Sequence, residues 1–275
     1  GKMAALNIFR KGLFEGQVAV VTGGATGIGF AIARTLGQLG CKVSICGRNA
    51  GRVQSGREAL TQACGALAPA LHHGLCDVRE SVQVGAYLQD VESQLGRPTI
   101  LINNAGGQFP TKSEDVSLKG WDAVLRNNLT GLFFFTQEMA NRYFIPDARG
   151  KIVNVTANVR RGFPGMVHTG CARAAVENLT KTLAVEWAVH NIQVNAVAPG
   201  IVLSSGTERY PPELLEAGRR ASLAKRFASC DEVSQLIVYL ASDASSFVTG
   251  ETWYIDGGAS LWGDNWSVPD FRKGK

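Results

Sequence analysis

The sequence lacks the features that would hold a chain in a membrane or build it around a metal ion. Its 275 residues include six cysteines and four histidines, but no CxxC pair and no Cys/His cluster with metal-ligand spacing. No apolar run approaches the roughly 18 residues that a membrane helix requires. We therefore expect no metal site, no disulfides and no membrane insertion, and we expect the cysteines to be small buried hydrophobes of a reducing compartment.

A strong charge of one sign is also missing. The 28 basic and 23 acidic residues leave a net charge of +5. This is too small to indicate a nucleic acid partner, although it suits an anionic small molecule. The composition, 45% hydrophobic and 19% charged, excludes a disordered or fibrous chain. Neither end carries a recognisable targeting signal, so the expected intracellular location is left open between a peroxisome-like organelle, a mitochondrion and the cytoplasm.

Short apolar runs alternate with segments of helical periodicity. The runs are mostly β-branched and are bounded by turn residues, at 17–22, 42–46, 71–77, 99–103, 151–155, 191–196 and 252–255. Helices are predicted over 27–40, 81–95, 120–143, 170–189 and 231–241. The alternation predicts one α/β domain over 1–275, a doubly wound Rossmann-type parallel sheet of about seven strands with helices on both faces. We interpret 201–228, which follows a strand end, as a substrate lid and 262–275 as a C-terminal tail.

The first predicted strand runs into a glycine-rich turn that opens a helix. Gly23 permits the tight turn, Gly27 lets the backbone approach a pyrophosphate, and Gly29 allows close packing of the helix on the strand. The N–H groups of the helix N-terminus then face the phosphates. The expected cofactor contacts of this turn are Thr22, Gly23, Thr26, Gly27, Ile28 and Gly29. The alternative is a tight strand–helix turn that binds nothing.

The end of the second strand indicates which dinucleotide binds. An acidic residue there would bind the ribose hydroxyls of NAD, whereas this chain has Arg48, followed by Arg52 one helical turn later. Because a guanidinium suits a phosphate, we expect NADPH with its 2′-phosphate at these arginines, unless Arg48 is a solvated turn residue. Asp77 and Val78, at the end of the third strand, are expected beside the adenine.

Several motifs, in order and at the expected spacings over about 15–260, resemble the short-chain dehydrogenase/reductase superfamily. They are the TGxxxGxG turn, Asn103-Asn104-Ala105-Gly106, Asn128 in Asn-Leu-Thr-Gly, Pro199-Gly200 and Asp256-Gly257-Gly258. The resemblance implies further cofactor contacts at Asn104, Ala105, Gly106, Pro199, Gly200 and Val202. It also implies a homo-oligomer, a dimer or tetramer, because helices 120–143 and 170–189 resemble the pair that packs across a two-fold axis in this superfamily.

The tyrosine and lysine of the superfamily's usual carbonyl chemistry are absent. That chemistry uses a Ser and a Tyr-x-x-x-Lys motif, but none of the five tyrosines is followed four residues later by Lys. Alignment of the residues after the Lys position places Arg173 there, Thr169 at the Tyr position and Thr156 at the Ser position. An aliphatic hydroxyl does not ionise near neutral pH, so ordinary ketone or alcohol redox chemistry is disfavoured.

Reduction of a carbon–carbon double bond conjugated to a thioester has a lighter requirement. The site must stabilise negative charge on the thioester oxygen, and Thr169, Arg173 and Asn128 are candidate donors. His168 is either a proton donor to the α-carbon or a histidine satisfied by a backbone carbonyl. We therefore predict an NADPH-dependent oxidoreductase that acts on the carbon–carbon bonds of unsaturated acyl-CoA.

Four segments resemble the peroxisomal trans-2-enoyl-CoA and 2,4-dienoyl-CoA reductases. They are 107–109, 162–164, 167–173 and 184–187. The resemblance implies substrate contacts at Gln108, Phe109 and Phe163, and Arg173 leans slightly toward the enoyl branch. Arg160 is a further candidate, for the CoA phosphates. Two other functions stay open: a carbonyl reductase that replaces the phenol by His168 or by an unaligned tyrosine, and a catalytically silent NADPH-binding protein.

Overall fold

The structure is a computed structural model that describes residues 8–204, 207 and 212–261. Its centre is a seven-stranded parallel sheet in the order β3-β2-β1-β4-β5-β6-β9. The strands are β1 (Val18–Thr22), β2 (Lys42–Gly47), β3 (Leu71–Leu75), β4 (Ile100–Asn103), β5 (Gly150–Val155), β6 (Ile192–Pro199) and β9 (Thr252–Ile255). The predicted single-domain doubly wound α/β fold is confirmed.

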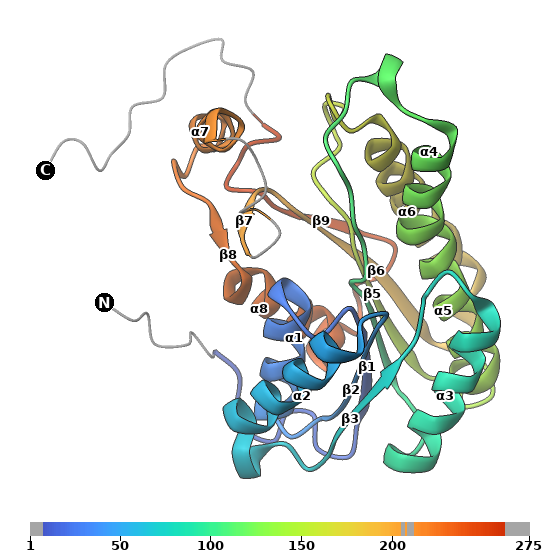
Figure 1. The fold of residues 1–275 in the computed structure, drawn as a ribbon. Helices are drawn as coiled ribbons and strands as arrows, with labels where there is room; N and C mark the ends of the chain where they lie inside the picture. The colour runs from blue at the N-terminus through green and yellow to red at the C-terminus, as the bar shows by residue number, and fades with distance from the viewer. Residues whose placement is uncertain (1–7, 205–206, 208–211, 262–275) are drawn as a thin grey trace, which may run out of the picture.

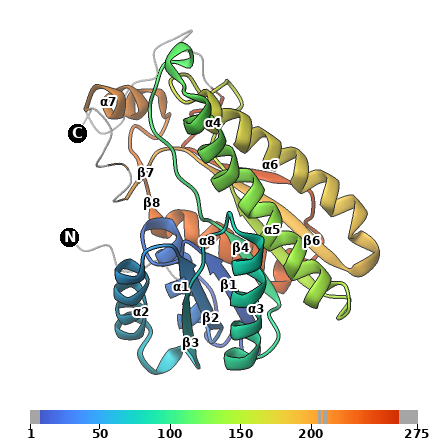
Figure 2. The same ribbon diagram turned by 45° about the vertical axis from the view of Figure 1, so that its right-hand side comes forward.

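Helices cover both faces of the sheet (Figures 1 and 2). One face carries α1 (Gly27–Gln38), α2 (Ala50–Cys64) and α8 (Cys230–Ala241). The other face carries α3 (Ser81–Leu95), α4 (Leu118–Leu125), α5 (Gly131–Met139) and α6 (Val167–Glu186). A π-helical turn, Arg126–Thr130, joins α4 to α5, so these two helices follow one another where the sequence predicts a single helix.

Helix α2 is missing from the sequence-based prediction. Its buried positions are Val53, Gly56, Leu60 and Cys64, of which only two carry a large aliphatic side chain. The apolar periodicity is therefore too weak to reveal the helix. The helix begins at a local N-cap, because the Asn49 side chain accepts a hydrogen bond from the backbone N–H of Arg52 at 2.9 Å.

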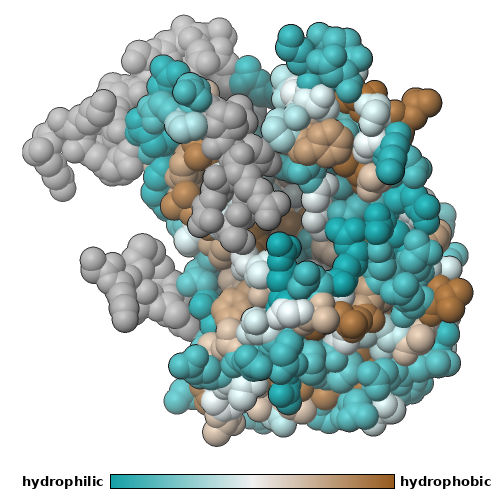
Figure 3. Space-filling view, in the orientation of Figure 1, coloured by the Kyte–Doolittle hydropathy of each residue, from teal (hydrophilic) through white to brown (hydrophobic). Residues whose placement is uncertain are grey.

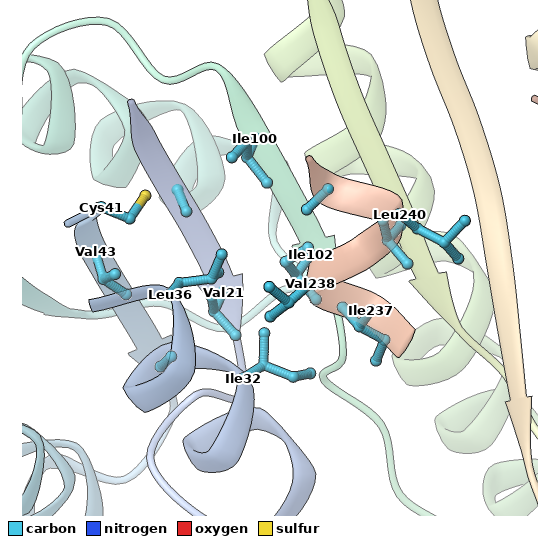
Figure 4. Packing of buried hydrophobic residues seen from close by; sticks show 14 of the residues in the cluster. Val21, Ile32, Leu36, Cys41, Val43, Ile100, Ile102, Ile237, Val238 and Leu240 are labelled. Carbon is cyan, nitrogen blue, oxygen red and sulfur yellow. The ribbon is translucent and has the colours of Figure 1, made fainter. Parts of the chain in front are cut away.

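Each face of the sheet has its own hydrophobic core, because successive strand residues point to opposite sides. Figure 4 shows Ile32 and Leu36 of α1 and Ile237 of α8 packed against Val21 of β1 and Ile102 of β4. On the other face, α3 and α5 cover the strands with Leu88, Phe135 and Met139. Burial of each such side chain contributes about 1.5–3 kcal/mol, so a Leu36→Ala change should cost about 2–5 kcal/mol.

The cysteines follow the expectation of burial only in part. Cys41, Cys46, Cys64 and Cys76 are buried, whereas Cys171 is exposed on α6 and Cys230 is partly exposed. The expectation is therefore wrong for Cys171, which occupies a solvent-facing position of a helix that is buried on its other side.

Buried amides join the two central strands to the helices beside them. Asn103 of β4 lies opposite Asn154 of β5, and its Nδ2 donates to Asn154 Oδ1 at 2.9 Å and to Thr136 Oγ1 of α5 at 2.8 Å. Asn154 Nδ2 in turn donates to Thr180 Oγ1 of α6 at 3.0 Å. Most buried polar groups are paired in this way, and in this network only Asn103 Oδ1 has no partner among the described residues. The network fixes β4 and β5 relative to the helix that carries Thr169 and Arg173.

The predicted lid segment stands apart from the sheet, above α1 and α8 (Figure 1). It contains α7 (Pro212–Ala221) and two short strands that pair in parallel, β7 (Val202–Leu203) and β8 (Ala228–Ser229). The backbone N–H of Ala228 donates to the Ile201 carbonyl at 3.0 Å, so the two ends of the segment are tied together.

Two remaining expectations concern the tail and the membrane. The predicted tail at 262–275 lies outside the described residues. Across 8–204, 207 and 212–261, no helix combines the length and the apolar character needed to cross a membrane.

Candidate functional site

The strand order reverses between β1 and β4, and the carboxyl ends of these two strands leave a crevice. Open α/β sheets bind their ligands at such a point. Two adjoining cavities of about 580 and about 230 Å³ lie here, and Gly23, Thr26 and Arg48 line both of them. The larger cavity extends to Arg52 and Asp77, and the smaller one reaches Val78 and the segment 104–106.

The glycine-rich turn has the geometry that a pyrophosphate requires. Gly23 and Gly27 have positive φ angles of +64° and +56°, which other residues rarely adopt. A Cβ on Gly29 would run into the Gly23 carbonyl and Asn104 Nδ2. The side chain of Thr26 makes no capping hydrogen bond to α1, so it leaves the first-turn N–H groups for a ligand. The turn therefore fits a dinucleotide phosphate.

Thr22 and Asn104 support this turn. The Thr22 hydroxyl accepts hydrogen bonds from the backbone N–H groups of Asn104 and Ala105, both at 3.0 Å. Asn104 Nδ2 donates back to the carbonyls of Thr22 and Gly23. Because Thr22 is buried and its hydroxyl is engaged inside the protein, the expected direct contact of this side chain with the cofactor is not supported.

The expected contacts Pro199, Gly200 and Val202 lie at the same edge of the sheet but line neither cavity. The backbone N–H of Gly200 donates to the Ile255 carbonyl at 3.1 Å, and Val202 is buried in β7. A Cβ placed on Gly27 would lie 3.6 Å from the Cβ of Ser204. The segment after Gly200 therefore crosses beside the glycine-rich turn.

Helix α2 holds two predicted arginines at the larger cavity. A Cβ on Gly56 would lie 2.7 Å from Cα of Ala25, so α2 packs closely on the glycine-rich turn. Arg48 precedes α2 and Arg52 lies in its first turn, and both line the cavity. Two guanidinium groups next to a phosphate-binding turn suit an additional phosphate.

Arg79 lines the same cavity, and the sequence-based prediction missed it. Its Nε donates to Asp77 Oδ1 at 2.9 Å and its Nη2 donates to Asp77 Oδ2 at 2.6 Å. These hydrogen bonds lower the pKa of Asp77, although partial burial opposes them. The sequence could have indicated Arg79, because it lies only two residues after the carboxylate of Asp77 at the end of a predicted strand.

Arg173 of α6 is a buried cation with unused donors. Its side chain is anchored by Nη1, which donates to the Val155 carbonyl at 2.8 Å, while Nε has no hydrogen-bond partner among the described residues. A Cβ on Gly106 would collide with Arg173 Nη2 and Asn128 Oδ1. Burial lowers the pKa of Arg173 to about 10, so the group stays charged at neutral pH. Arg173 lines neither cavity and lies behind Gly106, which lines the smaller one. Contact of its guanidinium with the ribose hydroxyls stays a prediction.

Asn128 and Thr156 are engaged within the protein rather than free to donate to a substrate. Asn128 lies in the π-helical turn, and its Nδ2 donates to the carbonyls of Gly107 and Val124 at 2.8 and 2.9 Å. The Thr156 hydroxyl donates to the Val197 carbonyl at 3.2 Å. The expectation that Asn128 donates to the thioester oxygen is therefore wrong for this conformation, in which Asn128 holds the loop after β4.

His168 and Thr169 are both 0% exposed at the start of α6. The Thr169 N–H donates to His168 Nδ1 at 2.8 Å, which places the imidazole proton on Nε2. Burial lowers the pKa of His168, partly opposed by the Met166 carbonyl, so the ring is neutral. The Thr169 hydroxyl lies 3.2 Å from His168 Nδ1. Neither side chain is positioned in this conformation for the expected direct contact with a substrate.

Two predicted apolar contacts lie over the start of α6. The Phe109 ring, 40% exposed, packs edge-to-face on His168 with 4.6 Å between ring centroids. A Cβ on Gly170 would lie 2.9 Å from the Cβ of Phe163. The backbone N–H of Thr111 donates to the Gly165 carbonyl at 2.8 Å and so joins the two loops.

The two polar substrate candidates, Gln108 and Arg160, are both exposed. Gln108 lies on the loop that carries Phe109. Arg160 is exposed and stacks on the Tyr254 ring, with its Cζ 3.9 Å from the ring centroid. Arg160 is therefore held at the far edge of the sheet, beside β9.

None of the described tyrosines whose pKa shifts is an activated phenol. Burial raises the pKa of Tyr87 and raises that of Tyr143 to about 12. Burial also raises the pKa of Tyr254, whose hydroxyl donates to Glu177 Oε1 at 3.0 Å. Tyr210 lies outside the described residues. An unaligned tyrosine that replaces the missing phenol thus finds no support among these three.

Comparison with known proteins finds relatives that match this chain over most of its length. The family model described as Enoyl-(Acyl carrier protein) reductase matches residues 23–260. A peroxisomal 2,4-dienoyl-CoA reductase of Danio rerio is 35% identical over 264 residues, 93% of this chain and 85% of the relative. The 3-oxoacyl-[acyl-carrier-protein] reductase FabG of Thermotoga maritima is 36% identical over 89% of this chain and 98% of its own length.

Solved structures place the chain in the same family. The citronellol catabolism dehydrogenase AtuB of Pseudomonas aeruginosa has a TM-score of 0.82 and 38% identity, over 93% of this chain and 99% of that one. The matches extend over nearly the whole chain and include its cofactor-binding turn. The protein is therefore an oxidoreductase of the short-chain dehydrogenase/reductase superfamily, whose members bind a nicotinamide cofactor.

Proposed function

We propose that the protein reduces a carbon–carbon double bond conjugated to the thioester of an unsaturated acyl-CoA, a trans-2-enoyl-CoA or 2,4-dienoyl-CoA, with NADPH as cofactor. One observation carries the proposal. Where carbonyl reduction needs a phenol and a lysine, this chain has the buried Thr169 and a desolvated guanidinium, Arg173. The similarity to peroxisomal 2,4-dienoyl-CoA reductases supports the same chemistry.

Reduction of a conjugated double bond requires positive charge near the thioester oxygen more than it requires an acidic side chain. When bound, reduced nicotinamide supplies a hydride to the substrate carbon. The electron pair of the double bond then moves to the thioester oxygen as an enolate, and a proton adds to carbon. Arg173 provides positive charge that water does not screen, and a preorganised donor of this kind is worth about 2–4 kcal/mol in the transition state.

The other side chains position the substrate in this proposal. Asn128 holds the backbone of Gly107, and Phe109 and Phe163 offer apolar surface to the acyl chain. Because His168 and Thr169 are buried, we assign the proton for carbon to water that enters the cleft. The lid role of 201–228 belongs to the same proposal, since this segment is tied at its base beside Gly200.

Arg48 and Arg52 support NADPH as the cofactor. Both line the larger cavity, and neither is paired with an acidic residue in the described part of the chain. A carboxylate at this strand end would instead favour the free ribose hydroxyls of NADH. The peroxisomal relatives favour a peroxisome among the three compartments left open.

A second function, reduction of a carbonyl group, is favoured by the similarity to the FabG reductase. The raised pKa values of Tyr87, Tyr143 and Tyr254 argue against it. A catalytically silent NADPH-binding protein would keep the cavity and Arg48 but show no turnover.

Separate assays with three thioester substrates distinguish these functions. The protein is incubated with NADPH and, separately, with crotonyl-CoA, 2,4-hexadienoyl-CoA and acetoacetyl-CoA, and the absorbance of reduced nicotinamide is followed while mass spectrometry identifies the product. We expect reduction of an unsaturated thioester and loss of this turnover in Arg173→Met, with Arg142→Met as the matched control. Reduction of acetoacetyl-CoA alone would make the protein a carbonyl reductase, and NADPH binding without any turnover would make it a silent binder.

A further inference from the structure

The larger cavity holds three arginines and one carboxylate. Arg48, Arg52 and Arg79 line it, and Asp77 is the single acidic residue among the described residues that line either cavity. The Arg79 guanidinium donates hydrogen bonds to both carboxylate oxygens of Asp77. The face over α2 and α3 is mainly hydrophilic (Figure 3).

The ion pair is held in place from several sides. The backbone N–H of Arg79 donates to Asp77 Oδ1 at 3.1 Å, and the backbone N–H of Asp77 donates to Gln83 Oε1 at 2.9 Å. Arg126 Nη2 donates to the Arg79 carbonyl at 3.4 Å. The side chains of Asp77 and Arg79 are 16% and 31% exposed, so solvent screens their charges only in part.

We infer that Arg79 determines the cofactor preference by neutralising Asp77, so that the cavity accepts an adenosine ribose that carries a phosphate. The inference rests on the proposed use of NADPH. Without Arg79, a carboxylate would share the cavity with the phosphate, and like charges at this range repel. Arg79 thus acts through Asp77 and is a positioning residue.

Asp77 carries a negative charge in the unmodified protein, because hydrogen bonds from Arg79 lower its pKa. In Arg79→Met the charge of Arg48 still favours the ionised carboxylate, since Arg48 also lowers the pKa of Asp77. The negative charge of Asp77 is therefore neutralised by its ion pair with Arg79. The cavity keeps the positive charges of Arg48 and Arg52 for the phosphate.

Binding titrations test the inference without any turnover. The probes are NADPH, NADH and adenosine 2′,5′-bisphosphate, with the unmodified protein, Arg79→Met, Asp77→Asn and the double variant. We expect Arg79→Met to bind NADPH and the bisphosphate at least tenfold more weakly and NADH less than threefold more weakly. Asp77→Asn in the Arg79→Met background should restore the bisphosphate to within threefold of the unmodified protein, because no charge is then left to neutralise.

The matched control is Arg97→Met. Arg97 forms a comparable ion pair with Asp147, at 2.9 Å, and lines neither cavity, so its loss should leave all three affinities unchanged. If Arg79→Met weakens bisphosphate binding and Asp77→Asn in that background does not restore it, Arg79 contacts the phosphate directly and the inference is overturned. An unchanged NADPH preference in Arg79→Met would also overturn it. Equal affinity of the unmodified protein for NADPH and NADH would instead overturn the proposed cofactor itself.

Discussion

Replacement of Arg173 by methionine should make the folded protein no less stable while it removes most of the activity. Burial lowers the pKa of this guanidinium well below its ordinary value, to about 10. At about 1.4 kcal/mol per pKa unit, the charge costs the cofactor-free folded state roughly 3 kcal/mol. The sign follows because a lowered pKa in a cation means that folding disfavours the charged form. At neutral pH the group is charged in both states, so this cost is fully present and is relieved only above about pH 10.

The lost hydrogen bond works in the opposite direction. Arg173 Nη1 donates to the Val155 carbonyl at 2.8 Å, and an unpaired buried carbonyl costs about 1–3 kcal/mol. We therefore expect Arg173→Met to raise the free energy of unfolding by about 0–2 kcal/mol. The turnover number kcat should fall by about 100- to 1000-fold, since the charge that the proposed function assigns to stabilising the enolate oxygen is lost. NADPH binding should weaken as well.

Urea unfolding without cofactor and steady-state kinetics with crotonyl-CoA measure the two effects on the same preparations. Arg142→Met is the matched control, because Arg142 pairs with Glu138 on the surface at 2.6 Å and lies away from the crevice. The control should change kcat by less than about twofold. A variant at Arg173 that keeps its activity and loses more than about 2 kcal/mol of unfolding free energy would show that the guanidinium is structural, and the reasoning would fail.

Four further outcomes are expected. Arg48→Ala should reduce the preference for NADPH over NADH at least tenfold in a titration, about 1.4 kcal/mol, and an unchanged ratio would contradict the phosphate role. Thr169→Val should change kcat less than about threefold because the hydroxyl is buried, and a larger loss would place it in the reaction after all. Arg226 lowers the pKa of Glu232 to about 2, so stability that is present above pH 4.5 is lost as the pH falls toward 2. In urea unfolding at pH 4.5 and at pH 2, Glu232→Gln should lose less unfolding free energy between the two pH values than the unmodified protein. Light scattering at micromolar concentration should find a dimer or tetramer through α5 and α6, and a monomer would refute that assembly.

The elements that place the site could be predicted because their signals are local. Apolar runs marked the strands, the glycines marked the turn that follows β1, and counting along one helix placed Arg173 at the position of the usual lysine. Arg79 could have been found in the same way, since its partner Asp77 lies only two residues earlier.

The engagement of the polar side chains could not be predicted, because it depends on distant parts of the chain. Thr156 donates to Val197, which is 41 residues away, and Asn128 contacts Gly107, which is 21 residues away. A hydroxyl or an amide at a catalytic position has the same sequence signature whether it faces a substrate or a neighbouring carbonyl. Only the packed structure decides between the two.

The paired amides of Asn103 and Asn154 have a consequence for how the chain folds. Parallel strands that are apolar on both sides can slide by two residues and still bury the same kinds of side chain. A slide of β5 along β4 and α6 would break the hydrogen bonds of Asn154 to Asn103 and to Thr180, and would leave the Asn154 amide unpaired in the protein interior. Such misaligned states are therefore penalised by about 1–3 kcal/mol for each stranded group. Apolar packing drives the halves of the sheet together, and this polar pair selects the single alignment in which Val155 meets Arg173.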